Sequence, residues 1–154
     1  MMTIGVGCAV VMAAALGVQA IAATVSQDDL NQHVRQYRLT ADNLRKMLAV
    51  DSELATLAKT AEAQPSAGIE ATVKTLDSDP QALGVFKKNQ ISGRDYLLTL
   101  ATALFTDLLV ELAGSGQAVT PEGITKDNVN LWKILPPDLR MTLQEWKKRR
   151  LQQR

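Results

Sequence analysis

Apolar residues recur at steps of three and four between positions 40 and 63, the spacing that places side chains on one face of a helix. Thr40 stands where an N-cap is expected, since its hydroxyl can accept a hydrogen bond from an unpaired amide of the first turn. Asp42 follows at the positive end of the helix dipole. The pattern therefore predicts a helix to about Ala63, with a buried face of Leu44, Met47, Val50, Leu54, Leu57 and Ala61.

Two shorter helices are expected next. The turn-forming segment Gln64–Gly68 ends the first periodic pattern. The segment Asp77–Pro80 both stops the following helix and starts another, because proline is preorganised for the first helical position and the residue before it can cap. We expect the second of these helices to end near Lys87–Asn89. The buried side of the first consists of Ile69, Val73 and Leu76.

The strongest local signal is the segment Ile91–Tyr96. Ser92 can cap a helix there, and Asp95 stands three residues later, as in a capping box. The helix is expected to run to Ala113 and to terminate at Gly114, which can adopt the left-handed conformation that closes a helix. Its apolar arc is broad and comprises Leu97, Leu98, Ala101, Leu104, Phe105, Leu108, Leu109 and Leu112.

A narrow polar seam of Asp95, Thr99, Thr102 and Thr106 interrupts that arc. The threonines could offer hydroxyls to a ligand, but threonines that bond back to their own helix are the commoner case. A helix so apolar is expected at the centre of a fold rather than on its surface.

A loop through Pro121 and Gly123 follows, and the apolar residues around Trp132 suggest a further short helix or turn. The segment Pro136–Asp138 restarts the chain as a last helix, with Leu139, Leu143, Trp146 and Leu151 at helical spacing. The whole pattern predicts an all-α domain over residues 40–154. We expect a small bundle of about five helices around one long apolar central helix, ending in a basic C-terminal helix.

The N-terminal segment determines the expected compartment. No charged residue occurs before Asp28, and residues 4–23 are rich in Ala, Val, Gly and Ile. We interpret residues 1–22 as a secretory signal peptide, because Ala20-Ile21-Ala22 supplies the small residues of a cleavage site. The alternatives are an uncleaved membrane anchor through residues 4–23 and a buried core helix. Residues 23–39 are expected to be a polar leader with one loose helical turn.

This interpretation makes the protein periplasmic or secreted, or membrane-anchored with its domain in the periplasm. Cys8, the single cysteine, would be removed with the signal peptide, so neither a disulfide nor a thiolate metal site is expected.

The chain of 154 residues is 46% hydrophobic and carries a net charge of +1. The near-balance of charge argues against a nucleic-acid binder, which normally has a marked basic excess. Charge segregates only from Lys126 onward, where eight basic residues stand against three acidic ones. The densest cluster is Lys147, Lys148, Arg149 and Arg150, which could contact an acidic partner or anionic lipid headgroups. Favourable placement at a helix C-terminus is the other interpretation.

Candidate chemistry is sparse. His33 has no metal-binding or nucleophilic partner at a recognisable spacing. Haem could in principle take His33 with Met47 or Met141, but Met47 falls on an apolar face and is better explained as core. Asp107 and Glu111 could hold a cation together, or could simply mark the solvent boundary of their helix. We therefore predict no cofactor, no metal site and no catalytic residue.

Three segments resemble a group of small exported bacterial helical proteins to which no activity is assigned. They are Tyr37-Arg38-Leu39-Thr40, the segment Ile91–Tyr96 and Asn128-Val129-Asn130-Leu131-Trp132. The resemblance covers most of residues 37–135 and implies export and an all-helical fold. The basic cluster from Lys147 onward is not a feature of that group.

We expect a non-catalytic exported protein that acts through protein interaction, as an accessory subunit of a cell-envelope or membrane complex. The alternative is a periplasmic bundle that holds an apolar or amphipathic ligand between the helices of Leu54 and Leu104. An enzyme is the third hypothesis, because a fold can assemble titratable residues that lie far apart in the sequence.

Overall fold

The computed structural model describes residues 27–57 and 69–152, and every regular element within them is a helix. The all-α prediction is confirmed for these residues, which form seven helices, six of them within the predicted domain of about five helices. The helices are α2 (Gln27–Gln36), α3 (Ala41–Leu57), α4 (Ile69–Ser78), α5 (Pro80–Lys88), α6 (Gly93–Gly114), α7 (Gly123–Lys133) and α8 (Pro137–Gln152).

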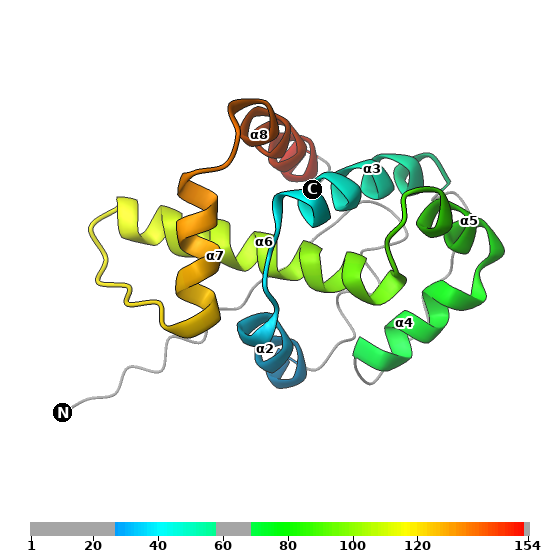
Figure 1. Ribbon diagram of the computed structural model, residues 1–154, viewed down its shortest axis with the longest axis horizontal. Coiled ribbons are helices and arrows are strands. Elements are labelled where there is room, and N and C mark those ends of the chain that lie inside the picture. The colour runs from blue at the N-terminus through cyan, green and yellow to red at the C-terminus, as the bar shows by residue number, and fades with distance from the viewer. Residues whose placement is uncertain (1–26, 58–68, 153–154) are drawn as a thin grey trace.

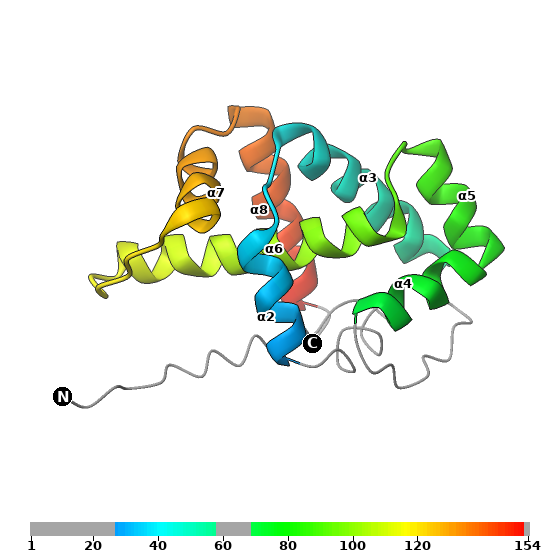
Figure 2. The same cartoon turned by 60° about the horizontal axis from the view of Figure 1, so that its bottom comes forward.

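The long apolar helix α6 is central, as its composition predicts. It runs across the middle of Figure 1 and packs against α2, α3, α4 and α7. Helix α5 packs against both α3 and α4, and α8 packs on α3. In Figure 2, α2 crosses α6 near its middle while α4 and α5 lie toward one end. The core between these helices is contiguous and includes Leu44, Met47, Val50, Phe86, Tyr96, Leu100, Leu139 and Trp146.

Several predicted helix ends are confirmed. Thr40 caps α3 by accepting from the amide of Asn43 at 3.1 Å. Asp79 caps α5 by accepting from the amide of Gln81 at 2.9 Å, with proline next in the chain. Ser92 caps α6 by accepting from the amide of Asp95 at 2.9 Å. These caps were predictable because each depends on residues within three positions of one another.

The C-terminal end of α6 differs from the prediction. Gly114 is the last helical residue, and the left-handed conformation belongs to Gly116, with φ of 84°. The amide of Gln117 reaches back to the carbonyl of Leu112 at 3.1 Å. The helix therefore closes two residues later than the first glycine suggests.

The threonine seam is buried, which reverses the usual place of polar residues. Thr99, Thr102 and Thr106 are 0% exposed. Leu104 and Leu108, from the apolar arc, are only half-buried. The seam lies under other helices because α2 and α7 both pack on α6. The hydroxyls of Thr102 and Thr106 have no hydrogen-bond partner in the part of the chain that the structure describes.

The expected polar leader contains a regular helix. Helix α2 has ten residues, its Val34 is 4% exposed, and it packs on both α6 and α7. The sequence suggested a leader because most of its side chains are polar. The predictions for residues 1–22, for an anchor at 4–23 and for the turn at 64–68 lie outside the described residues.

Helix α6 is also long and apolar enough to cross a membrane, by length and composition, and it alone meets that criterion among the described helices. About two fifths of its most apolar stretch is buried inside the fold (39%). A core helix in a soluble protein meets the same criterion.

Gly93 allows the start of α6 to approach α4 and α5. A Cβ atom there would lie 2.9 Å from Asp77 Oδ1 and 3.3 Å from Phe86 Cε2. The Asp77 side chain is exposed and can move, whereas Phe86 is 2% exposed and packs on the ring of Tyr96 at 5.6 Å between centroids. An added methyl group could therefore displace the Asp77 side chain but not the buried ring of Phe86.

We expect Gly93→Ala to lower the free energy of unfolding by about 1–2 kcal/mol, because the extra methyl group overpacks the contact with Phe86. Gly84→Ala is the matched control, since nothing lies within 4 Å of a Cβ at that exposed position of α5. Alanine there should stabilise by about 0.5–1 kcal/mol through helix propensity. Urea denaturation followed by circular dichroism measures both, and a stabilising Gly93→Ala would contradict the assignment.

Candidate functional site

A single carboxylate on α3 gathers three donors from α6 and α8. Asp51 accepts from the Tyr96 hydroxyl at 2.9 Å and from the indole N–H of Trp146 at 2.8 Å. It also forms a short ion pair with the guanidinium of Arg150. We call these four residues the Asp51 cluster. It joins positions that lie up to 99 residues apart in the sequence.

The Asp51 cluster is largely removed from water. The side chains of Arg150 and Asp51 are 9% and 15% exposed. The guanidinium carbon of Arg150 lies 4.7 Å from the centroid of the Trp146 ring, a cation–π contact that adds to the ion pair. Arg150 Nε has no hydrogen-bond partner among the described residues. These contacts hold α8 against α3 and α6.

A second ion-pair group ties α8 to α6 on the neighbouring side. Lys147 Nζ donates to Asp107 Oδ2 at 2.6 Å and makes a short contact with Glu111. Burial alone would lower the pKa of Lys147, but the hydrogen bonds to the two carboxylates outweigh it and raise the pKa. We call these residues the Lys147 triad. The cation that Asp107 and Glu111 hold is thus a lysine of the same chain.

Only two of the four residues in the predicted basic cluster form ion pairs within the described part of the chain. Lys147 and Arg150 turn inward, where three carboxylates neutralise them. Lys148 and Arg149 are exposed and form no ion pair with any residue that the structure describes. Whether the cluster contacts a partner or lipid stays a prediction, and only its outward half is available for it.

A pocket of about 480 Å³ lies between α6, α7 and α8. The sequence alternative placed a ligand between the helices of Leu54 and Leu104, which are α3 and α6. Leu54 is buried in the core, and the partly buried Leu104 packs against the same core. This pocket lies elsewhere, and its lining consists of Asp107, Val110, Glu111, Trp132, Lys133, Leu135, Arg140, Leu143, Gln144, Trp146 and Lys147.

Asn128 is a buried residue whose side chain binds the backbone of another segment, a role that the sequence did not reveal. Its side chain is 2% exposed. The amide nitrogen donates to the carbonyl of Tyr37 at 2.8 Å, and the amide oxygen accepts from the backbone N–H of Leu39 at 2.8 Å. Beside them, Arg38 pairs with Asp127 at 3.0 Å. Asn128 thus fastens the chain between α2 and α3 onto α7.

The three segments of the sequence resemblance meet here. The Tyr37 hydroxyl lies 3.0 Å from Thr99 Oγ1 and 3.3 Å from Asp95 Oδ1, and it accepts from the Asn43 side-chain amide at 3.1 Å. The first segment therefore contacts the second through Tyr37 and the third through Asn128. Their contacts serve the assembly of the helices.

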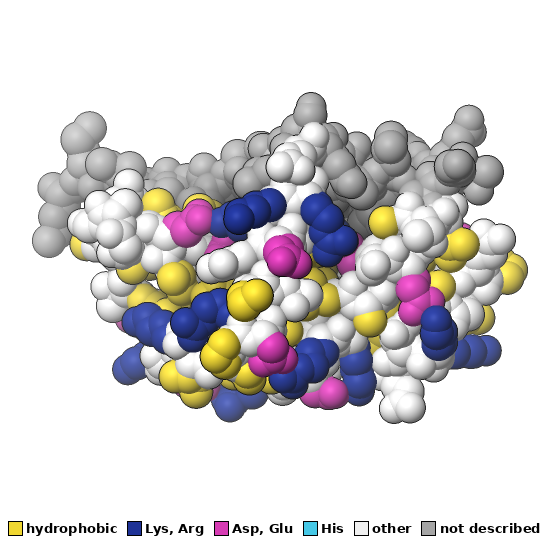
Figure 3. Space-filling view, turned by 90° about the horizontal axis from the view of Figure 1, so that it is seen from above, with side chains coloured by type: hydrophobic (Ala, Val, Ile, Leu, Met, Phe, Trp, Pro, Cys, Tyr) yellow, Lys and Arg dark blue, Asp and Glu magenta, His cyan; other side chains and the backbone are white. Residues whose placement is uncertain are grey.

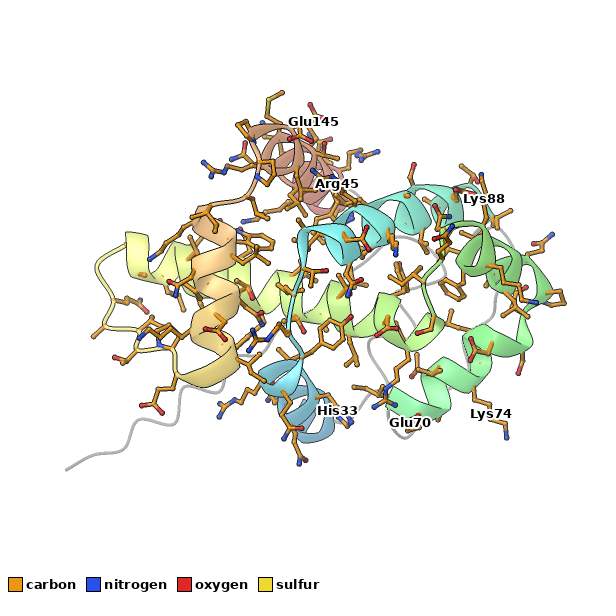
Figure 4. All side chains as sticks on the ribbon, viewed as in Figure 1. His33, Arg45, Glu70, Lys74, Lys88 and Glu145 are labelled. Atoms are coloured by element: carbon orange, nitrogen blue, oxygen red, sulfur yellow. The ribbon has the colours of Figure 1, made fainter. Side chains whose placement is uncertain are left out.

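The remaining sequence candidates do not converge. Met47 is fully buried in the core, as expected for packing, while Met141 is 62% exposed on α8. His33 is half-buried on α2, which Figure 4 places on the opposite side of the molecule from α8. Within residues 27–57 and 69–152, no three His, Cys, Asp or Glu side chains are grouped to hold a metal ion.

The two tyrosines provide a test of the hydrogen-bond networks. Burial raises the pKa of Tyr96 well above 10, and the charge of Asp51 adds to the effect. Burial also raises the pKa of Tyr37, supported by the charge of Asp95, although hydrogen bonds from Thr99 and Asn43 work in the opposite direction. Both phenols are therefore held in the neutral form by the fold.

We expect the folded protein to show tyrosinate absorbance at 295 nm only above pH 10, while the chain in denaturant titrates near 10. The unfolded chain then ionises first, so the contribution to stability is complete below pH 10 and is lost as the pH rises above it. Tyr96→Phe should remove the later step of the titration. A native tyrosine that ionises at or below pH 10 would contradict these networks.

Comparison with known proteins identifies no relative: no family model, no curated protein and no solved structure matches this chain.

Proposed function

We propose that this chain is an exported, non-catalytic helical protein that docks an acidic surface of a partner protein in the cell envelope, as an accessory subunit of a larger assembly. The partner would bind the outer face of α8, which we define as Met141, Lys148 and Arg149. The observation that carries the proposal is the exposure of Met141, at 62%, on the same side of α8 as Lys148, with the exposed residues Glu145 and Arg149 beside them.

The outer face of α8 combines apolar and basic groups. Met141 and Lys148 are seven residues apart and therefore share one side of the helix. Ile134, in the turn before α8, is 76% exposed. Figure 3 looks down on this side, where basic and acidic side chains lie among apolar ones. Exposed apolar anchors beside unpaired charges are typical of protein-interaction surfaces.

A rigid support favours this use of α8. The Asp51 cluster and the Lys147 triad hold the inner side of the helix on α3 and α6. A preorganised helix loses less conformational entropy when a partner binds. The ion pairs thus orient Lys148 and Arg149 outward without using their charge.

The magnitude of the remaining charge favours a protein partner over a lipid surface. Each basic residue near an anionic membrane contributes about 1 kcal/mol. Two outward cations therefore give about 2 kcal/mol, whereas micromolar affinity requires about 8 kcal/mol. Apolar contacts of Met141 and Ile134 with a complementary protein surface would supply the larger part.

Site-specific photo-crosslinking in the native envelope tests the proposal. A photoreactive residue is placed at Met141, and another at Lys74, an exposed residue of α4 that Figure 4 shows far from α8. We expect one defined protein adduct from position 141 and none from position 74. The double substitution Lys148→Glu with Arg149→Glu should reduce that adduct at least about tenfold, because reversed charge repels an acidic partner.

Equal adducts from both positions, or an adduct that survives the charge reversal, would overturn the docking surface. Adducts with lipid alone, together with sedimentation on phosphatidylglycerol vesicles, would assign the surface to the membrane instead. Export has its own measurement: the intact mass of the protein from its native host should lack residues 1–22. A full-length chain dissolved in the cytosol would contradict it.

A further inference from the structure

The pocket between α6, α7 and α8 has apolar walls. Both tryptophans of the chain, Trp132 and Trp146, line it, together with Val110, Leu135 and Leu143. Trp146, Leu135 and Leu143 are at most 5% exposed, so these walls are fixed in the core. A volume of about 480 Å³ falls within the range of small-molecule sites.

The charges around the pocket are not balanced. Asp107, Glu111 and Lys147 pair with one another in the Lys147 triad, whose net charge is −1, and Lys133 and Arg140 bring the net charge of the pocket lining to +1. Lys133 and Arg140 are exposed at the rim and pair with no carboxylate among the described residues. Arg140 uses one terminal nitrogen on the backbone oxygens of Lys133 and Leu135, at 2.9 and 3.2 Å, which leaves its other N–H groups available.

We propose that this pocket binds a small amphipathic acid. The hydrophobic body lies against the two indole rings, and the acid group pairs with Arg140 and Lys133 at the rim. A cationic ligand would find both carboxylates already occupied by Lys147. The proposal concerns the inner edge of α8 and is independent of partner docking on its outer face.

The two tryptophans report on binding directly, because no other indole contributes to the fluorescence. The probes are octanoate, 1-octanol and octylamine, which share one eight-carbon chain and differ in charge. They are titrated into the full chain below their micelle concentrations. We expect a saturable change in tryptophan emission with octanoate, at least about tenfold weaker binding of octanol, and no saturation with octylamine.

Three variants distinguish the pocket from non-specific binding. Val110→Phe fills the pocket and should abolish the octanoate signal. Lys133→Gln should weaken octanoate several-fold and leave octanol unchanged, and Lys133 is preferred to Arg140 because Arg140 also supports the turn between α7 and α8. Lys74→Gln removes an equal charge from an exposed position of α4, outside the pocket, and should leave octanoate binding unchanged.

Circular dichroism verifies that Val110→Phe is folded. Octanoate that binds no better than octanol, binding that Val110→Phe leaves intact, or no saturation with octanoate would each overturn the proposal. If Lys74→Gln weakened octanoate binding as much as Lys133→Gln does, the preference for an acid would reflect net charge alone, and the proposal would also be overturned.

Discussion

Asp51→Ala is expected to lower the free energy of unfolding by about 3–5 kcal/mol, because it removes one partner of a buried ion pair and leaves the other uncompensated. Arg150 would keep its charge in a site where its side chain is only 9% exposed. The indole N–H of Trp146 and the hydroxyl of Tyr96 would lose their acceptor as well. Thermal unfolding followed by circular dichroism should show a midpoint lower by about 10 °C or more.

Asp42→Ala is the matched control for this experiment. Asp42 is also a carboxylate of α3 with a cationic partner, Lys46 at 2.8 Å, but its side chain is 70% exposed. Its loss should cost less than about 1 kcal/mol, since solvent screens the pair. A similar cost for the two variants would contradict the burial of the Asp51 cluster.

A double variant separates the buried charge from the rest of the cluster. Combining Asp51→Ala with Arg150→Met removes the uncompensated guanidinium, so the double variant should be more stable than the sum of the two single effects predicts. Strict additivity would mean that Asp51 acts through Trp146 and Tyr96 alone.

The ion pairs of α8 show why the direction of each cation in the basic cluster could not be predicted from the sequence. Four adjacent cations look like one surface, but a helix turns by 100° at each residue, so adjacent side chains point in different directions. Lys147 and Arg150 carry the inward charges of that segment. Their carboxylate partners lie 36 to 99 residues earlier in the chain.

The helix ends were predictable because caps are local. Thr40, Asp79 and Ser92 each accept from an amide two or three residues ahead. The long helix was predictable from its composition. Helix α2 was missed because most of its side chains are polar, although its Val34 is buried.

The candidate site was less predictable than the fold. The pocket requires α6, α7 and α8 to meet, and no local pattern encodes that meeting. The sequence did mark Asp107 and Glu111 as neighbours on one face, which is correct, but it could not identify Lys147 as their cation. Buried polar residues such as Asn128 leave no periodic signal at all, since their partners are backbone atoms far along the chain.

Asn128→Leu is the second variant with a large expected effect, a loss of about 2–4 kcal/mol in the free energy of unfolding. Leucine has the same branched arrangement of heavy atoms as asparagine but carries no hydrogen-bonding group, and the site is 2% exposed. It cannot replace the two hydrogen bonds, so the carbonyl of Tyr37 and the amide of Leu39 are left without partners. Each unsatisfied buried group costs about 1–3 kcal/mol.

Asn130→Leu provides the comparison, because Asn130 belongs to the same helix and is exposed. Its effect should stay within about 0.5 kcal/mol. Hydrogen exchange adds a local readout. In Asn128→Leu the amides of α2 should lose more protection than those of α5. The reason is that α2 packs on α6 and α7 and that Asn128 binds the segment directly after α2. If α2 keeps its protection while the whole protein is destabilised, Asn128 acts as a general core residue, and the fastening role is wrong.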